Sequence, residues 1–255
     1  MQNAQKEKLY LGIDGGGTRC RARIVNSAGE TLGEAMRGGA NTRLGINHVF
    51  GEIIAAATMA LKEAGLSDSR ISDLHAGLGL AGLPLERERK LAESYKHPFA
   101  SACFATDAYT ACLGAHDGAD GAILIVGTGT CGQAIVEGRE LALAGWVFEI
   151  SDIGSGARIG RTAIETALLA HEGLAVSSEL TRAVMKHFND NPEEIVAFAE
   201  KARPADYGAF CPMVFDADSH SDSTAAAIID VAVTANRNIL HKLQEFGAKR
   251  LSLMG

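Results

Sequence analysis

The chain has 255 residues, of which 47% are hydrophobic, and a formal net charge of −7 at pH 7. This length allows one large domain or two small ones, and the negative charge argues against nonspecific binding to nucleic acid or to an anionic membrane. Residues 1–8 contain no apolar signal core, no apolar stretch is long enough to span a bilayer, and the five cysteines form no C-x-x-C pair. We therefore expect a cytoplasmic protein with reduced thiols and with no nucleic-acid or membrane partner.

The hydrophobic pattern of the first half predicts the order β-β-β-α-β-α-β-α. The predicted strands cover residues 9–13, 21–25, 31–36, 71–80 and 100–105, and the predicted helices cover residues 46–64, 85–95 and 108–115.

A second cycle of strands begins near Gly121 and is followed by a mostly helical region. The predicted strands cover residues 122–126, 131–136, 141–145 and 250–253, and the predicted helices run from the turn at 152–156 through His171 and over 178–188, 192–201 and 224–246. We place the domain boundary near Asp117 and Gly118, which gives domains at residues 1–117 and 118–255 with a cleft between them. Clefts between domains are common ligand sites.

A glycine-rich pattern occurs once in each half of the chain. Residues 11–29 read L-G-I-D-G-G-G-T-R-C-R-A-R-I-V-N-S-A-G, and residues 124–138 read L-I-V-G-T-G-T-C-G-Q-A-I-V-E-G. Each copy is an apolar run, a turn rich in glycine and threonine, a cysteine and a second β-rich run, so that Cys20 falls in register with Cys131. Two ordinary hairpin turns are the alternative, but the repetition favours two hairpins that bind one polyphosphate.

The residue types in these turns suit phosphate binding. Glycine has no Cβ, so the backbone can approach a ligand closely, and consecutive N–H groups in such a bend form an anion-binding concavity. Asp14 occurs only in the first copy, and an acid there is suited to a hydrated Mg²⁺ ion, which we expect it to hold through water. The predicted phosphate-binding residues are Gly15, Gly16, Gly17, Thr18, Gly127, Thr128, Gly129 and Thr130, with the threonines adding hydroxyl donors.

Asp107 has both a structural and a functional interpretation. It follows a predicted strand and opens a predicted helix, and an Asp in such a place is often an N-cap; from the residues alone we favour the cap. The C-terminal end of a strand in an open α/β sheet is also where ligands bind, and a carboxylate there could accept the proton of an attacking hydroxyl.

Three further positions carry similar alternatives. Asn41, with Thr42 beside it, and Asp152 lie in glycine-rich turns, where they are either turn residues or bind sugar hydroxyls. Trp146, the only tryptophan, is either a core or stacking residue or a wall of a sugar pocket.

Four motifs resemble, in their order along the chain, those of the N-acetylglucosamine/glucosamine kinase branch of the actin-like, sugar-kinase and chaperone ATPase superfamily. They are D-G-G-G-T at residues 14–18, T-D-A at 106–108, G-T-G-T at 127–130 and S-D-I-G-S-G at 151–156. The similarity is especially close to bacterial glucosamine-specific kinases over residues 106–116. The last motif departs from ordinary N-acetylglucosamine kinases, which usually have G-D-E-G-S, because Ser151 precedes the Asp and Ile153 follows it.

The resemblance implies an α/β fold with two ribonuclease-H-like (actin-like ATPase) domains that close over a central cleft on ATP, Mg²⁺ and sugar. It implies that Asp107 is the base near the sugar hydroxyl and that Asp14 holds Mg²⁺ through water. Asn41 and Asp152 would bind sugar hydroxyls, and the two glycine loops would hold the ATP phosphates. The implied activity is ATP-dependent phosphorylation of an amino sugar at the 6-hydroxyl by a homodimer.

The same hypothesis predicts a preference for glucosamine over N-acetylglucosamine. The free amine of glucosamine is largely cationic near neutral pH, so its site should offer a carboxylate and little apolar room. Asp152 is one candidate carboxylate, and Glu149 is another.

The alternative hypothesis is a nucleotide-dependent switch of the same superfamily, either an activator or a regulator. A DNA-binding regulator would need a helix-turn-helix segment or a basic face, and the sequence shows neither. A different branch of the superfamily contains activators of acyl-CoA dehydratases, which bind an iron–sulfur cluster through cysteines. The cysteine positions here offer no such pair.

The end of the chain departs from the kinase pattern. In such kinases an adenosine-binding turn and a closing helix follow a strand like the one at residues 251–254. This chain stops at Gly255, which we include among the expected nucleotide-binding residues. We therefore expect these residues to be part of a longer chain and the C-terminal domain to lack its end.

Overall fold

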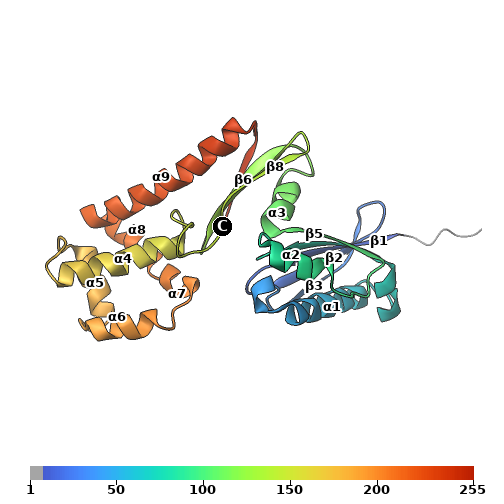
Figure 1. Ribbon diagram of the computed structural model, residues 1–255, viewed down its shortest axis with the longest axis horizontal. Coiled ribbons are helices and arrows are strands. Elements are labelled where there is room, and N and C mark those ends of the chain that lie inside the picture. The colour runs from blue at the N-terminus through green and yellow to red at the C-terminus, as the bar shows by residue number, and fades with distance from the viewer. Residues whose placement is uncertain (1–7) are drawn as a thin grey trace, which may run out of the picture. The chain divides into compact units, whose positions relative to one another are not determined.

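The computed structural model describes residues 8–255, which form two compact units, the first ending at Gly114 and the second covering Ala115–Gly255. Each unit contains its own β-sheet (Figure 1). The mixed α/β architecture with two sheets agrees with the predicted fold class.

The sheet of the first unit has the strand order β3-β2-β1-β4-β5. Its strands are β1 (Leu9–Gly15), β2 (Cys20–Val25), β3 (Thr31–Arg37), β4 (Leu74–Leu80) and β5 (Ser101–Thr106). The first three form an antiparallel meander, whereas β1, β4 and β5 run parallel. Leu9, Leu11 and Ile13 of β1 are buried and the residues between them are exposed, as the two-residue period of a strand requires.

Helix α1 (Ile46–Glu63) packs on the buried face of this sheet. It approaches β3 closely, because a Cβ on Gly33 would lie 2.3 Å from the carbonyl oxygen of Ala60. The remaining helices of this unit are α2 (Glu86–Glu93) and α3 (Asp107–Ala115).

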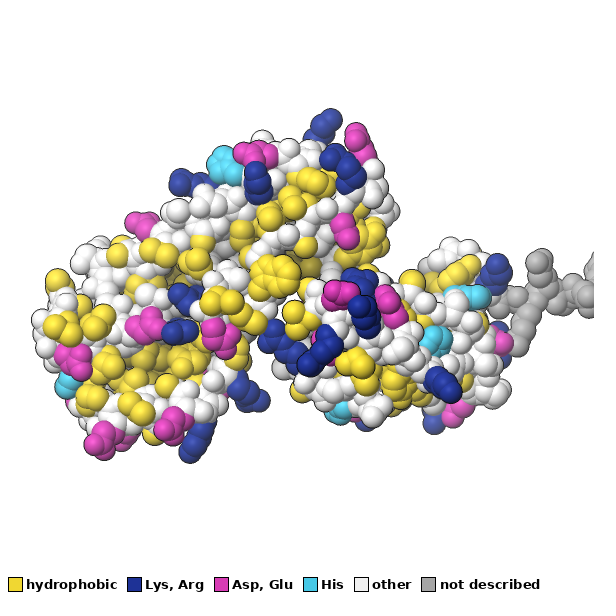
Figure 2. Space-filling view, in the orientation of Figure 1, with side chains coloured by type: hydrophobic (Ala, Val, Ile, Leu, Met, Phe, Trp, Pro, Cys, Tyr) yellow, Lys and Arg dark blue, Asp and Glu magenta, His cyan; other side chains and the backbone are white. Residues whose placement is uncertain are grey.

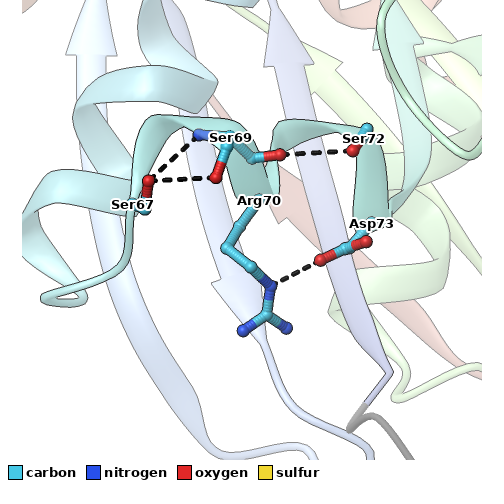
Figure 3. Close-up of polar contacts among 5 residues, drawn as sticks. All are labelled: Ser67, Ser69, Arg70, Ser72 and Asp73. Atoms are coloured by element: carbon cyan, nitrogen blue, oxygen red, sulfur yellow. Dashed lines mark hydrogen bonds and ion pairs between the residues drawn. The ribbon is translucent and has the colours of Figure 1, made fainter.

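The connection from α1 to β4 differs from the prediction. Residues 71–73 were expected to begin a strand, but they belong to a 3-10 helix, η2 (Asp68–Asp73). Local side-chain bonds hold this turn (Figure 3): Ser67 Oγ accepts the N–H of Ser69, Ser72 Oγ donates to the Ser69 carbonyl, and Arg70 pairs with Asp73. Serine and aspartate side chains compete with strand pairing in this way.

The sheet of the second unit has the strand order β8-β7-β6-β9. Its strands are β6 (Gly121–Val126), β7 (Thr130–Val136), β8 (Arg139–Ala144) and β9 (Leu251–Met254). The first three again form an antiparallel meander, and β9 pairs in parallel with β6.

Six helices complete the described part of the second unit. They are α4 (Gly156–His171), α5 (Glu179–His187), α6 (Pro192–Ala199), α7 (Pro204–Gly208), α8 (Cys211–Ser219) and α9 (Ser223–Glu245). No separate element was predicted for residues 202–223, which contain α7 and α8, although a proline in the first turn of each is a helix-start signal.

Helix α9 runs from the helical cluster to the sheet of its unit (Figure 1). Its first half, with Ala225, Ile228 and Ala232, packs in the core of the helices, and Leu243 in its second half packs on Ala122 and Ala134 of the sheet. One helix therefore links the two packing regions of this unit.

The surface shown in Figure 2 carries Lys and Arg interspersed with Asp and Glu, with exposed hydrophobic side chains between them. Within residues 8–255, no helix is both long enough and apolar enough to cross a membrane.

Asp222 joins the start of α9 to the start of α5. Its Oδ1 accepts the N–H groups of Thr224 at 2.9 Å and Ala225 at 3.0 Å, and its Oδ2 accepts the N–H of Leu180 at 2.9 Å. Burial alone would raise the pKa of Asp222, but these hydrogen bonds outweigh it and hold the pKa below the usual value. The bonded carboxylate therefore stabilises the fold only while it is ionised.

We expect Asp222→Asn to lower the free energy of unfolding by about 1–2 kcal/mol at pH 7, because the amide offers a single oxygen to donors that now use two. The folded pKa is depressed, so the contribution is fully present above the unfolded pKa of about 3.9 and is lost as the pH falls through the folded pKa. The stabilities of wild type and variant from urea unfolding should begin to converge near pH 4 and should meet as the pH falls through the lower folded pKa. Asp230→Asn, at an exposed site of the same helix, is the matched control, and an equal loss at pH 3 and pH 7 would contradict the assignment.

Candidate active site

The parallel strands of the first unit bring two acids to one edge of the sheet. Asp14 near the end of β1 pairs with Gly79 of β4, and Gly79 pairs with Ala105 of β5. Asp107 follows β5 directly and is the first residue of α3. Ligands bind at this carboxyl edge in open α/β sheets.

The structure separates the two interpretations of Asp107. Thr106 Oγ1 accepts the N–H of Tyr109 at 3.1 Å, which is the bond expected of an N-cap three residues earlier. The carboxylate of Asp107 accepts only nearby backbone donors among the described residues: Oδ1 accepts the N–H of Ala108 at 2.9 Å, and the N–H of Asp107 itself also interacts with the carboxylate. Since Thr106 performs the main capping role, one oxygen of Asp107 is left for another partner.

Gly79 determines how closely α3 lies against β4. A Cβ on Gly79 would lie 2.2 Å from Thr110 Oγ1, a separation that real side chains do not show. Thr110 Oγ1 in turn donates to the carbonyl oxygen of Asp107 at 2.9 Å. The missing side chain of Gly79 therefore allows α3 to begin at the sheet edge with Asp107 in its first turn.

The pKa of Asp107 is raised above its ordinary value. Burial is the main cause, and the negative charge of Asp14 adds to it, while the N–H of Ala108 acts in the opposite direction. A carboxylate with a raised pKa holds a proton more strongly, which favours proton acceptance from a hydroxyl. Asp14 itself is half-exposed and pairs with Arg21, directly opposite on β2, at 3.0 Å.

The first glycine loop, residues 15–18, is held mainly through its carbonyl oxygens. The Gly15 carbonyl accepts the N–H of Ala81 at 2.8 Å, and the Gly16 carbonyl accepts the N–H of Ala40 at 2.8 Å. Gly17 and Thr18 are exposed, and their N–H groups have no partner among the described residues. This loop therefore presents unpaired N–H groups at the same edge as the acids.

Asn41 and Thr42 lie beside this loop, but they are not equally accessible. Asn41 Oδ1 accepts the N–H of Arg43 at 2.9 Å and so caps a 3-10 turn, η1 (Thr42–Leu44), as the turn interpretation predicted. Thr42 is 1% exposed, and a Cβ on Gly82 would lie 2.3 Å from its Oγ1. The predicted contact of Thr42 with a sugar is therefore wrong for this structure, because the protein covers its hydroxyl.

The second glycine loop, residues 127–130, is held by the start of α4. The Gly127 carbonyl accepts the N–H of Gly156 at 2.8 Å, and the N–H of Gly127 donates to the Gly129 carbonyl at 2.9 Å. The N–H groups of Thr128 and Gly129 have no partner within the described residues, and Thr128 is exposed. Like the first loop, this one leaves donors for an anion.

Thr130 differs from its prediction. It is 2% exposed, and its hydroxyl faces the carbonyl oxygen of Ile125 at 3.0 Å and Asn236 Oδ1 at 3.2 Å. The predicted donation from this hydroxyl to a phosphate is therefore corrected to an internal role. The cause is a one-residue difference between the loops: Cys20 closes the first hairpin opposite Gly15, but Thr130, not Cys131, closes the second opposite Val126. A shift of one residue changes the face to which a strand side chain points.

Asp152 lies beside the second loop. It is 7% exposed, its Oδ1 accepts a hydrogen bond from Ser151 Oγ at 2.7 Å, and a Cβ on Gly129 would lie 2.9 Å from its Oδ2. Trp146, which is 60% exposed, is not a core residue, so the core interpretation of this tryptophan is wrong. Glu149 is exposed, and its carbonyl oxygen accepts a hydrogen bond from Arg158.

Gly255 lies against the end of β6, where a Cβ would be 2.2 Å from the carbonyl oxygen of Val126. This places it next to the second glycine loop, which begins at the following residue. Its role toward a nucleotide stays a prediction.

Three residues that support the site were not predicted from the sequence. The signal for Gly79 was its place inside an apolar strand, where a glycine often marks the close approach of another part of the chain or of a ligand. Asn236 was signalled by its place inside a helix, where asparagine is unfavourable without a partner. Thr106 carried no signal of its own, because the neighbouring Asp107 was an equally good cap.

Comparisons with known proteins agree with this architecture. Residues 11–255 match the model of the BadF/BadG/BcrA/BcrD ATPase family. The chain is 42% identical to a glucosamine kinase of Vibrio cholerae over 246 residues, which covers 96% of this chain and 84% of the relative.

Solved structures give the same result. A crystal structure from Chromobacterium violaceum, provisionally named an N-acetylglucosamine kinase, matches with a TM-score of 0.86 and 31% identity, covering 97% of this chain and 87% of the other. One from Porphyromonas gingivalis, with the same provisional name, shares the fold at a TM-score of 0.59 and 17% identity, covering 97% of this chain and 94% of the other. The resemblance seen in the motifs is thereby confirmed, and the chain belongs to the BadF/BadG/BcrA/BcrD ATPase family.

Proposed function

We propose that this protein transfers the γ-phosphoryl group of ATP to the 6-hydroxyl of an amino sugar and that glucosamine is its preferred substrate. The similarity to the glucosamine kinase of Vibrio cholerae extends over 96% of the chain and supports the substrate class. The observation that carries the mechanism is Asp107, which combines a raised pKa with an oxygen that α3 does not need.

In the proposed mechanism, Asp107 orients the sugar hydroxyl and accepts its proton as the hydroxyl oxygen attacks the γ-phosphorus. The bond from the γ-phosphorus to the bridging oxygen breaks, which gives the sugar 6-phosphate and ADP. We assign phosphate binding to the unpaired N–H groups of both glycine loops, at Gly17, Thr18, Thr128 and Gly129. Most of the rate enhancement in such transfers comes from positioning and from stabilising charge.

The acids of the first unit fit a hydrated Mg²⁺ ion. Asp14 is half-exposed at the sheet edge beside the first glycine loop, and Mg²⁺ keeps several waters and takes only one or two carboxylates in addition to substrate phosphates. We propose that Asp14 holds the ion through water, where the ion would neutralise phosphate charge. Arg21, now paired with Asp14, would then have to share or release this carboxylate.

The assignment of the sugar side is also part of the proposal. Asp152 is a buried carboxylate, and its Oδ2 is the atom nearest to Gly129. A carboxylate in such a place suits either a sugar hydroxyl or a cationic amine. Asn41 retains its amide nitrogen as a donor, since its Oδ1 is used in the η1 turn.

Purified protein should release ADP with glucosamine and Mg²⁺–ATP, and it should do so with a higher kcat/KM than with N-acetylglucosamine. The physical reason is that a site with a carboxylate favours the cationic amine over a neutral, bulkier amide. A coupled ADP assay across glucose, glucosamine, N-acetylglucosamine and mannosamine measures this. Efficient turnover of N-acetylglucosamine with none of glucosamine would refute the preference, and no ADP release with any sugar would refute the kinase.

Asp107→Asn should lower kcat by about 10²–10⁴, the usual contribution of a general base, and leave the fold intact. Thr106→Val is the matched control for the loss of a cap, because it removes the capping hydroxyl; it should cost about 1 kcal/mol of unfolding free energy and lower kcat far less than Asp107→Asn does. Steady-state kinetics and thermal unfolding of both variants separate the roles. A large loss of stability with near-normal kcat in Asp107→Asn would show that Asp107 is only a cap.

In Mg²⁺-free protein, Asp14→Asn should lower the pKa of Asp107, because the neighbouring negative charge that helps to raise it is removed. The carboxylate must be ionised to act as a base, so the activity measured with Mg²⁺–ATP should increase as the pH rises through the pKa of Asp107. Carboxyl-carbon NMR titration measures the shift directly, and Asp68→Asn, an exposed site in the same unit, should leave it unchanged. An Asp107 titration that is identical in wild type and Asp14→Asn would contradict the coupling.

A further inference from the structure

We propose that Asn236 is a positioning residue that fixes the second glycine loop relative to residues 151–156, so that the loop is held ready for a phosphate. This inference rests on the proposed function, which assigns phosphate binding to that loop.

Asn236 uses both ends of its side-chain amide. Its Oδ1 accepts from Thr130 Oγ1 at 3.2 Å, and its Nδ2 donates to the carbonyl oxygen of Gly154 at 3.0 Å. These partners lie more than 80 residues away in sequence and belong to two different segments. The amide is therefore a bridge between the end of the glycine loop and the turn that leads into α4.

The position of Asn236 in α9 explains why this bridge is rigid. The residues before it pack in the core of the helices, with Ala232 in that core, and those after it pack on the sheet, with Leu243 fully buried there. Asn236 is half-buried between these two anchored parts. A side chain fixed by packing on both sides can hold two loops with little freedom of its own.

Gly154 shows how closely the bridge fits. A Cβ at this position would lie 2.1 Å from Asn236 Oδ1 and 2.6 Å from its Nδ2. The turn therefore passes directly over the amide, and the absence of a side chain at Gly154 is a requirement of the contact. Asp152 lies two residues earlier and the Ser155 cap of α4 lies one residue later.

Two attachments of the glycine loop follow from this geometry. The Gly127 carbonyl at its start is held by the N–H of Gly156, and the Thr130 hydroxyl at its end is shared between the Ile125 carbonyl oxygen at 3.0 Å and Asn236 Oδ1 at 3.2 Å. Asn236 also holds Gly154, two residues before Gly156. Loss of the amide would leave the loop held by the N–H groups of Gly156 and Ala157 and by strand pairing at Thr130, but it would remove the link between Thr130 and the Gly154 turn. The unpaired N–H groups of the loop would then be less firmly fixed in direction. Binding of a phosphate would then have to order the loop, which weakens affinity.

The test compares Asn236→Ala and Asn236→Asp with Asn238→Ala and Asn238→Asp. Asn238 is an exposed asparagine two residues along the same helix, so the pairs are matched in residue type, charge change and helix propensity. We expect the Kd for ATP, measured by calorimetry without sugar, to rise about three- to tenfold in Asn236→Ala and to stay within about twofold in Asn238→Ala. Asn236→Asp should be at least as impaired, because it places a carboxylate oxygen against the Gly154 carbonyl.

A double-mutant cycle separates positioning from general stability. Thr130→Val and Asn236→Ala should be less than additive in the Kd for ATP, because each removes the same bond. Likewise Gly154→Ala should weaken ATP binding in wild type but add little in Asn236→Ala, where the obstructing amide is gone. A lower melting temperature with an unchanged Kd for ATP, strictly additive effects, or equal effects at Asn236 and Asn238 would each overturn the proposal.

This experiment is independent of the proposed sugar substrate. If wild type binds ATP but phosphorylates no sugar, the proposed function fails while the Kd comparison still judges Asn236. If wild type phosphorylates glucosamine and the Asn236 variants bind ATP normally, only the positioning role fails. If wild type does not bind ATP, both fail.

Discussion

Each glycine loop is attached to its unit by a hydrogen bond to a loop carbonyl, and the N–H groups of both candidate sites depend on this arrangement. Gly16 accepts the N–H of Ala40 at 2.8 Å in the first unit, and Gly127 accepts the N–H of Gly156 at 2.8 Å in the second. In both cases the donor follows the third strand of an antiparallel meander. A loop held in this way is fixed in position while several of its donors stay unpaired, which is the condition for binding an anion through backbone groups.

The sheet edge that carries Asp14 and Asp107 depends on a second constraint. One residue caps the helix, and its neighbour keeps a carboxylate oxygen free. An Asp at the first position of a helix would ordinarily use its oxygens on the free N–H groups, but Thr106 accepts the bond to Tyr109. Gly79 provides the space that brings this helix start to the sheet. The charge of Asp14 and the burial of Asp107 then act together to raise the pKa of Asp107. Thr106 and Gly79 therefore act on the Asp107 carboxylate indirectly. Thr106 caps the helix in its place, and Gly79 lets the helix begin close to the sheet.

The sequence predicted most strands and longer helices because their periods are local, and it located both glycine loops because glycine and threonine recur there. The prediction failed where the local conformation or the burial of a side chain depends on residues distant in sequence, or on the exact position of one residue. The 3-10 helix at Asp68–Asp73 follows from serine side-chain bonds that a hydrophobic pattern does not register. Thr42 was placed correctly in its turn, but its burial depends on Gly82, which is distant in sequence. Thr130 was assigned to phosphate binding because it ends the G-T-G-T turn, but it begins β7 opposite Val126 and its side chain is buried there.

The one-residue shift between the two hairpins also explains why the two loops are supported differently. In the first hairpin the closing position holds Cys20, which is fully buried, and burial, with the charges of Glu52 and Asp14, raises its pKa to about 12. The thiol is therefore neutral at pH 7, and it supports the loop by packing. In the second hairpin the closing position holds Thr130, whose hydroxyl needs acceptors once it is buried, and Asn236 supplies one. In the first unit, the glycine loop is thus supported by apolar packing of Cys20. In the second unit, the glycine loop is supported by hydrogen bonds of Thr130. One part of this second support, the bond from Thr130 to Asn236, can be removed by changing a single amide on α9, a helix that lies outside the loop, while the contact of Thr130 with the Ile125 carbonyl is kept.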